Sequence, residues 1–147
     1  MCVTATRPSG AQLRQLAAGC WLSSDGERAA PVSRGDGPDG PGDGSGGPWS
    51  RAAPVAVGPA DPGGYPSERG PYRSRVVLAE GKNREVRRLF ASAGLDVTAL
   101  KRTRVGGYRL PRDLAPGKAR RLRPHEVRRV TNLGEQTRLQ RALGVED

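Results

Sequence analysis

Three arginines stand close together in the run from Glu80 to Phe90, at spacings that suit the binding of phosphate. A guanidinium binds an anion through paired hydrogen bonds and keeps its charge throughout the range of pH that a protein meets. At about 100° per residue, Arg84, Arg87 and Arg88 fall on one side of a helix. The apolar residues between and after them fall on the other side, namely Val86, Leu89, Phe90 and Ala93. The pattern predicts a helix that packs one face inward and presents arginines near its positive end.

The residues around this helix predict a small sheet that positions it. A strand over Arg73–Ala79 leads through Gly81 into the helix Arg84–Ala93, with Asn83 as the expected cap and Gly81 as the flexible entry. After a turn at Gly94 we expect further strands, over Val97–Val105, Tyr108–Leu110 and Ala119–Leu122, and a helical turn from Pro124 to Arg128. Strands joined by short turns, with one helix among them, indicate an α+β fold with a mainly antiparallel sheet.

The rest of the chain divides by composition. Residues 1–34 predict a short strand (Val3–Thr6), a helix (Ala11–Ala18) and a loop through Asp25-Gly26. Residues 33–71 hold 11 Gly and 8 Pro, too few apolar side chains to offset the entropy of ordering. We therefore expect four parts: a partial domain segment (1–34), a disordered insertion (35–71), a second domain segment (72–130) and a helical or frayed tail (131–147).

The charge of the chain is concentrated in its second half. Residues 71–147 carry 19 Lys and Arg against 8 Asp and Glu, whereas residues 1–70 carry 6 against 7. A concentrated basic surface points to a polyanion as the partner. A merely solvated basic surface is the alternative, which the arrangement on one helix face disfavours.

Several classes of protein are disfavoured by composition. No apolar run approaches the ~20 residues that span a bilayer, and no signal-peptide core follows Met1. Cys2 and Cys20 lack the spacing of a metal or redox site, which favours a reducing, intracellular compartment, either cytoplasm or organelle. His125 is the sole histidine, and we expect it to be a surface residue.

The run over residues 75–127 resembles the end of the catalytic domain of the RsuA-like ribosomal RNA pseudouridine synthases. In that family a strand ends in E-G-(K/R)-x-x-x-V-(R/K)-R-hydrophobic-F, followed by L-x-R-x-R-(I/V)-G, L-x-P-G-x-x-R-x-L and a Glu. The chain matches these motifs in order at Glu80–Phe90, Leu100–Gly106, Leu114–Leu122 and Glu126. A looser match to a segment between the two halves of the catalytic sheet covers Leu13–Gly26. The resemblance implies a partial sheet of the pseudouridine-synthase type with a flanking basic helix.

The resemblance also implies a chemistry, which uses no metal and no organic cofactor. These enzymes break the bond between uracil N1 and ribose, turn the base and rejoin it through carbon. An aspartate in a G-R-L-D motif attacks or stabilises the ribose of a flipped nucleotide, and a tyrosine stacks on the base. This chain contains no G-R-L-D, and in the family both the aspartate and the tyrosine lie upstream of the run matched here. Asp96 occupies the position of a turn residue, and the glycine-rich insertion would hold Asp36, Asp39 and Asp43 in no fixed place.

One catalytic position of the family is matched in this chain. The basic residue that pairs with the aspartate corresponds to Arg87. The alternative interpretation is that Arg87 is one more arginine that binds phosphate. Leu100 corresponds to the apolar residue of the base pocket, although a core position is equally open. We expect contacts to the RNA backbone from Lys82, Arg84, Arg88, Lys101, Arg102 and Arg104.

We therefore interpret the chain as part of a pseudouridine synthase that lacks the nucleophile and is inactive alone, with structured ribosomal RNA as its partner. A non-catalytic RNA-binding protein is the alternative, and a basic interaction protein without an RNA role is a third. The resembling part is small and would lack its partner strands, so we expect it to need the other half of the domain for full stability.

Overall fold

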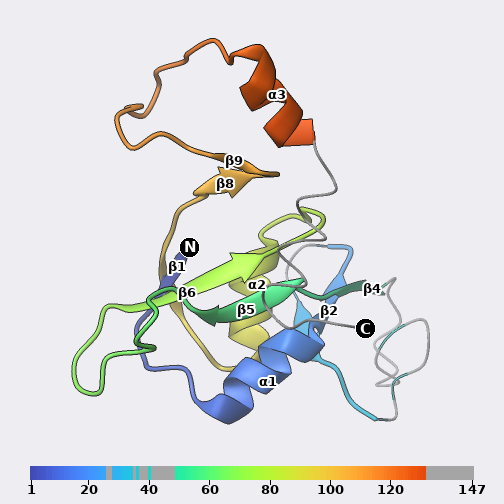
Figure 1. The fold of residues 1–147 in the computed structure, drawn as a ribbon. Helices are drawn as coiled ribbons and strands as arrows, with labels where there is room; N and C mark the ends of the chain where they lie inside the picture. The colour runs from blue at the N-terminus through green and yellow to red at the C-terminus, as the bar shows by residue number, and fades with distance from the viewer. Residues whose placement is uncertain (26–27, 35, 37–39, 41–48, 132–147) are drawn as a thin grey trace. The chain divides into compact units, whose positions relative to one another are not determined.

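The fold is described from a computed structural model, which places residues 1–25, 28–34, 36, 40 and 49–131. The chain divides after Leu100 into two compact units, which are described separately. Within the described residues the secondary structure is α+β with antiparallel sheets, as the sequence predicted (Figure 1). The predicted tail helix over residues 133–143 lies outside the described residues.

The first unit contains a four-stranded antiparallel sheet in its described part. Its order is β5 (Ala56–Pro59), β6 (Tyr72–Val77), β1 (Cys2–Thr4) and β7 (Val97–Leu100). Strand β1 lies in the middle, where Cys2 is opposite Ser74 on β6 and Leu100 on β7. The segments that begin and end this unit are therefore neighbours in the sheet.

A second sheet of the same unit is formed by β3 (Ala29–Pro31), β2 (Cys20–Ser23) and β4 (Trp49–Ala52), in that order. All four residues of β2 are buried, because β2 is the central strand and lies against α2. Helix α1 spans Gly10–Ala18 and α2 spans Glu85–Ser92.

Both helices contribute to one apolar core. Leu16 from α1 and Leu89 and Phe90 from α2 are fully buried. They form one cluster with buried residues of the strands and of the turn after α2, namely Cys2, Cys20, Leu22, Ala52, Ala93, Leu95 and Val97. Burial of side chains of this size stabilises a fold by about 1.5–3 kcal/mol each. The core is what fixes α2 relative to β2 and β7.

Helix α1 is capped as its sequence requires. The Ser9 hydroxyl accepts from the Gln12 amide, and the Gln12 side chain accepts from the Ser9 amide, which is a complete capping box. The Gln12 and Gln15 side chains donate to the Ala93 and Ser92 carbonyls. These bonds join α1 to the last turn of α2.

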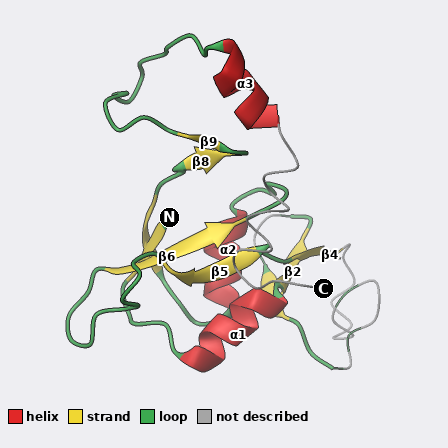
Figure 2. Cartoon of the chain, viewed as in Figure 1, coloured by secondary structure: helices red, strands yellow, loops and turns green. Residues whose placement is uncertain are grey.

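The second unit is a hairpin of β8 (Arg104–Val105) and β9 (Tyr108–Arg109) followed by α3 (Pro124–Thr131). The single strand predicted over Val97–Val105 is thus divided into β7 and β8. The strand predicted over Ala119–Leu122 is absent: this stretch is part of the long loop between β9 and α3 (Figure 2). Four cationic side chains in the six residues from Lys118 to Arg123 leave little apolar surface for a sheet to bury.

The prediction of disorder over residues 35–71 is wrong for its middle part, which contains β4 and β5. The glycines cluster in residues 35–47 and 58–70, whereas the run from Arg51 to Val57 contains none. The prediction used the Gly and Pro content of the whole segment, which concealed this apolar run. Ala52 and Pro54 of the run are buried. Residues 37–39 and 41–48, including Asp39 and Asp43, lie outside the described residues.

Gly19 shows how tightly α1 is joined to the second sheet. It ends the helix with a φ of 88°, and a Cβ there would lie 2.3 Å from the Ala52 carbonyl oxygen. We predict that Gly19→Ala lowers the free energy of unfolding by at least about 2 kcal/mol, because the left-handed conformation and the contact with backbone both oppose a side chain. Urea denaturation followed by tryptophan fluorescence measures the change.

Gly63→Ala is the matched control, since its φ is ordinary and nothing lies within 4 Å of a Cβ there. We expect its stability to stay within about 0.5 kcal/mol of the parent. Equal stability of the two variants would contradict the close contact between Gly19, at the end of α1, and the Ala52 carbonyl of β4.

Candidate functional site

The start of α2 differs from the predicted cap. The first residue before the helix is Arg84, which has a φ of 51° and makes no side-chain cap; Asn83 does not cap the helix, and Gly81 does not supply the left-handed turn. Instead the Glu85 carboxylate accepts from the Lys82 amide at 2.7 Å, which closes the turn. Left-handed backbone at a non-glycine residue costs roughly 1–2 kcal/mol, so the surrounding structure must impose it at Arg84.

Arg87 lies on the outward side of α2, as predicted. The residue is exposed, and its Nη1 donates to the Val97 carbonyl at 2.8 Å. Val97 begins β7, an edge strand of the described sheet, so the guanidinium lies beside that edge. A guanidinium has five N–H donors, and this contact uses one of them. The arrangement orients Arg87 and leaves donors to bind a carboxylate.

Arg88 does not lie beside Arg87 on the outward side, which corrects the prediction. Only 8% of the residue is exposed. Its Nη2 donates to the Ser23 carbonyl at 2.8 Å and the Ser23 hydroxyl at 3.2 Å, and also to the Arg28 carbonyl. The guanidinium is therefore occupied inside the first unit, and we do not assign it a contact with RNA.

The geometry of the helix explains this correction. Glu85, Arg88 and Leu89 share one side at spacings of three and four residues, and all three are buried. The outward stripe is narrower than predicted and consists of Arg84, Arg87 and Ala91. The arginine spacing did not show that the loop between β2 and β3 offers carbonyl groups to Arg88.

The remaining predicted phosphate contacts fall in both units. Lys82 forms an ion pair with Glu80 at 3.0 Å and also donates to the Arg51 carbonyl, so its ammonium is already engaged. Arg84 is exposed in the first unit. The exposed cations Lys101, Arg102 and Arg104 belong to the second unit.

Leu100 is exposed at the end of β7, so it is not a residue of the described core. At 46% exposure it is one of the large apolar side chains that face solvent. It lies three residues, or roughly 10 Å, along the strand from Val97, where Arg87 is bound.

Asp36 departs from the prediction that nothing holds it in place. Its carboxylate accepts from the Trp21 indole at 2.8 Å and from the Ser33 amide at 2.7 Å. Both contacts are structural. Asp96 precedes β7, and its carbonyl accepts from the Ala5 amide, in accord with the expected turn role.

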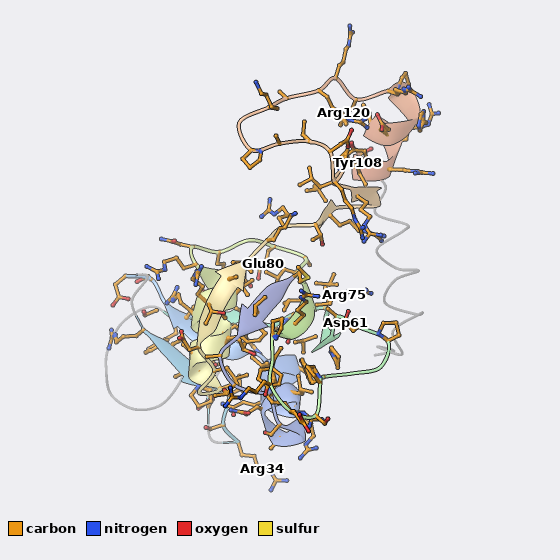
Figure 3. The ribbon with its side chains drawn as sticks, turned by 90° about the vertical axis from the view of Figure 1, so that its left-hand side faces the viewer. Arg34, Asp61, Arg75, Glu80, Tyr108 and Arg120 are labelled. Carbon is orange, nitrogen blue, oxygen red and sulfur yellow. The ribbon has the colours of Figure 1, made fainter. Side chains whose placement is uncertain are left out.

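The second unit contains a polar cluster that the sequence reasoning missed. The Arg120 guanidinium donates to the Tyr108 hydroxyl at 2.9 Å and forms an ion pair with Glu126, and the two labelled side chains Tyr108 and Arg120 meet in Figure 3. The Glu126 carboxylate also accepts from the Arg123 amide at 2.8 Å, which caps α3. The cluster joins β9, the long loop and α3. The available signal was a Glu three residues after Arg123, the residue before the helix.

The two cysteines are buried and structural. Burial raises the pKa of both the Cys2 and the Cys20 thiol, so neither is a thiolate at neutral pH. In the described ranges no group of three His, Cys, Asp or Glu side chains could hold a metal ion. None of the described helices is long and apolar enough to cross a membrane.

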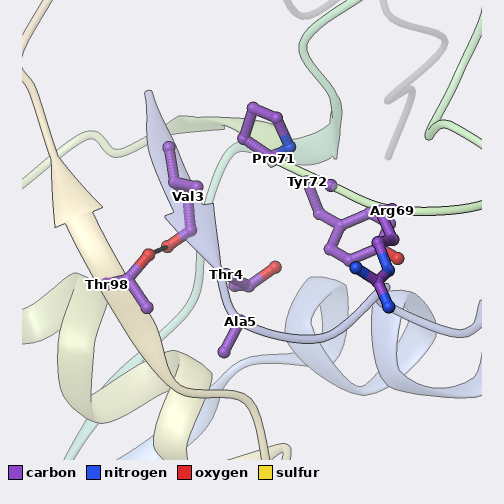
Figure 4. Close-up of a pocket in the computed structure, with 8 residues that line it drawn as sticks. Val3, Thr4, Ala5, Arg69, Pro71, Tyr72 and Thr98 are labelled. Atoms are coloured by element: carbon purple, nitrogen blue, oxygen red, sulfur yellow. Dashed lines mark hydrogen bonds between the residues drawn. The ribbon is translucent and has the colours of Figure 1, made fainter.

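A shallow hollow of about 490 Å³ lies over β1 in the first unit (Figure 4). Its walls come from β1, from the loop before β6, from Tyr72 of β6 and from Thr98, whose hydroxyl donates to the Val3 carbonyl. None of the predicted site residues lines this hollow. We assign no catalytic role to it.

Comparison with known proteins supports the family resemblance. The chain is 52% identical over 56 residues to a protein of Arabidopsis thaliana named as a chloroplastic ribosomal large subunit pseudouridine synthase. It is 53% identical over 53 residues to ribosomal large subunit pseudouridine synthase B of Xylella fastidiosa, and 42% identical over 60 residues to ribosomal small subunit pseudouridine synthase A of Escherichia coli. The resemblance to the RsuA-like synthases is confirmed.

The similarity covers a minority of each protein. The matches span 38%, 36% and 41% of this chain, and 14%, 11% and 26% of the respective relatives. No protein-family model matches the chain. No solved structure matches it either, so the specific fold of the synthases is not established by comparison.

The different burial of the two neighbouring arginines predicts different effects on stability. We expect Arg88→Met to lower the free energy of unfolding by about 2–3 kcal/mol, because it leaves buried carbonyl groups without their charged donor. Arg87→Met, the matched control, should change it by less than about 1 kcal/mol, since the residue is exposed. Urea denaturation of both variants measures the difference, and equal losses would contradict the burial of Arg88.

The Arg120–Glu126 cluster predicts a pH dependence of the second unit. The Arg123 amide, and next to it the Arg120 charge, lower the pKa of Glu126 below its ordinary 4.5. A carboxylate with a lowered pKa stabilises the fold above its ordinary pKa and loses that contribution as the pH falls through the lowered value. The NMR signals of Tyr108 and α3 should therefore shift together in acid, below pH 4.5. In Glu126→Gln this acid transition should be absent, and its persistence would show that Glu126 is not its cause.

Proposed function

We propose that this chain supplies the arginine-bearing part of the catalytic domain of a pseudouridine synthase that acts on ribosomal RNA. The named relatives are ribosomal pseudouridine synthases. The family motif found in the sequence, Glu80–Phe90, contains Arg87. The matched part of this chain covers only 11–26% of these relatives. The proposed activity therefore needs further segments of the catalytic domain. Residues carrying G-R-L-D and the stacking tyrosine would have to come from outside the sequence given.

The observation that carries the proposal is the position of Arg87. Of the two neighbouring arginines on α2, Arg88 is buried and bonded to carbonyl groups, whereas Arg87 is exposed beside the β7 edge. A strand edge is where further strands can be added. A carboxylate delivered there would meet a guanidinium that is already oriented.

The proposed role of Arg87 is electrostatic. An aspartate that attacks the ribose must stay ionised, and an adjacent guanidinium favours the ionised form while fixing its direction through two hydrogen bonds. In the isomerisation the N1 bond to ribose breaks, the C5 bond forms, C5 loses its proton to solvent, and N1 gains one. Arg87 takes part in none of these bond changes and acts by holding the carboxylate.

The function is tested with the completed protein, in which this chain is joined to an upstream half that carries G-R-L-D. The measurement is tritium release from 5-tritiated uridine in ribosomal RNA. We expect the completed protein to release tritium and Arg87→Ala to slow it by at least about 100-fold, as loss of one charged positioning donor does in other enzymes. Arg14→Ala, which removes an exposed arginine of α1, is the control for loss of one surface charge, and it should retain most of the rate.

Full activity of the Arg87→Ala protein would refute the proposed role. Failure of the completed protein to release tritium, while RNA binding by the chain is retained, would favour the second candidate, a non-catalytic RNA-binding protein. That candidate is supported by the basic composition alone.

A further inference from the structure

The net charge of the chain resides almost entirely in the described part of the second unit. Residues 101–131 contain 11 Lys and Arg and 2 Asp and Glu, a net charge of +9, against +10 for the whole chain. Every one of these cationic residues is exposed. They are Lys101, Arg102, Arg104, Arg109, Arg112, Lys118, Arg120, Arg121, Arg123, Arg128 and Arg129.

Two of these arginines face each other across the hairpin. Arg104 on β8 is directly opposite Arg109 on β9, so both side chains lie on the same face of the two strands. Like charges in directly opposite positions destabilise a strand pair. Val105 and Tyr108 form the next pair and lie on the other face, toward the Arg120 cluster.

No acidic side chain of the described residues neutralises this pair. Glu126 is engaged by Arg120 and the Arg123 amide, and no ion pair joins Asp113 to either arginine in the described ranges. Neither Arg104 nor Arg109 has an ion pair or side-chain hydrogen bond within the described ranges. The hairpin therefore places two exposed arginines in directly opposite positions, at a cost in stability.

The described part of the unit, residues 101–131, also lacks a buried core to offset that cost. Among residues 101–131 no side chain is buried, and Val105, Leu110 and Val127 are more than 40% exposed. The described contacts are polar: the Gly107 amide donates to the Arg129 carbonyl at 2.7 Å, and the Leu110 amide donates to the Thr103 carbonyl at 2.9 Å. A unit of this kind gains stability from any ligand that neutralises its charge.

We infer that residues 101–131 form a binding unit for the phosphate backbone of RNA, in which Arg104 and Arg109 together hold one stretch of backbone. Each guanidinium can supply the paired donors that phosphate oxygens accept, and the two arginines project from the same face of the hairpin. Backbone contacts of this type fix the position of an RNA without reading its sequence. The choice of RNA among polyanions rests on the proposed function. The inference extends it by locating the main backbone contact in the second unit and not on α2.

The first test measures the salt dependence of binding to a ribosomal RNA hairpin by the full chain. Each phosphate contact contributes about 0.7–0.9 to the slope of log affinity against log salt. We expect Arg104→Gln/Arg109→Gln to lower the magnitude of that slope by about 1.4–1.8. The variant should fold at least as well as the parent, because it removes a like-charge pair, and circular dichroism checks this.

The matched control is Arg73→Gln/Arg75→Gln. Arg73 and Arg75 are also exposed and lie on one face of a strand, but that strand is β6 of the first unit. The double substitution removes the same two charges. Their slope should equal that of the parent. Equal reductions in both double variants would show that the charge acts diffusely, and no reduction in Arg104→Gln/Arg109→Gln would show that the hairpin is not the contact. Either result overturns the inference.

The second test follows amide hydrogen exchange at Gly107 and Leu110 in the full chain. RNA should increase their protection, and inorganic polyphosphate should do so as well, since the recognised group is phosphate. Protection that stays unchanged with both probes would overturn the inference. Tritium release tests the role of Arg87, and amide exchange tests the binding unit of residues 101–131. A failure of one proposal can therefore be distinguished from a failure of the other.

Discussion

The buried guanidinium of Arg88 is the interaction on which the described arrangement of the first unit depends. It donates to two backbone carbonyls and one hydroxyl in the segment from Ser23 to Arg28, which joins β2 to β3. Leu89 and Phe90 pack in the core beside it. Burying a charge is unfavourable unless hydrogen bonds compensate it. These acceptors bind Nη2 in one orientation of the helix, whereas the buried Nε has no partner. The rotation of α2 about its axis is fixed as a result.

That rotation decides which arginine is available for chemistry. With Arg88 turned inward, Arg87 faces out beside the β7 edge, bonded to the Val97 carbonyl. The same constraint leaves Arg84 on the surface in a left-handed conformation. Phosphate binding, by contrast, is supported by a different part of the chain, the basic hairpin of the second unit. The two proposed roles, catalytic positioning and polyanion binding, thus fall on separate elements.

The sequence predicted the elements of the first unit well where apolar spacing was regular. Helix α2 and strand β6 begin and end within two residues of their predicted bounds. In α2 the reason is that buried side chains such as Leu89 and Phe90 recur at helical spacing. It failed where tertiary contacts decided the outcome. The inward turn of Arg88 depends on carbonyl groups some 60 residues away, and strands β4 and β5 exist because β2 and β6 pair with them. A like-charge pair such as Arg104 and Arg109 is invisible until the hairpin register is known.

The measurement that bears most directly on this account is solvent exchange of the arginine side-chain N–H groups, followed by NMR in the full chain. The account predicts slow exchange for the Arg88 guanidinium, which is buried and bonded, and fast exchange for Arg84, which is exposed on the same helix. If Arg88 exchanged as fast as Arg84, the buried contact with Ser23 and Arg28 would not exist. The orientation of α2, and with it the position of Arg87, would then be contradicted.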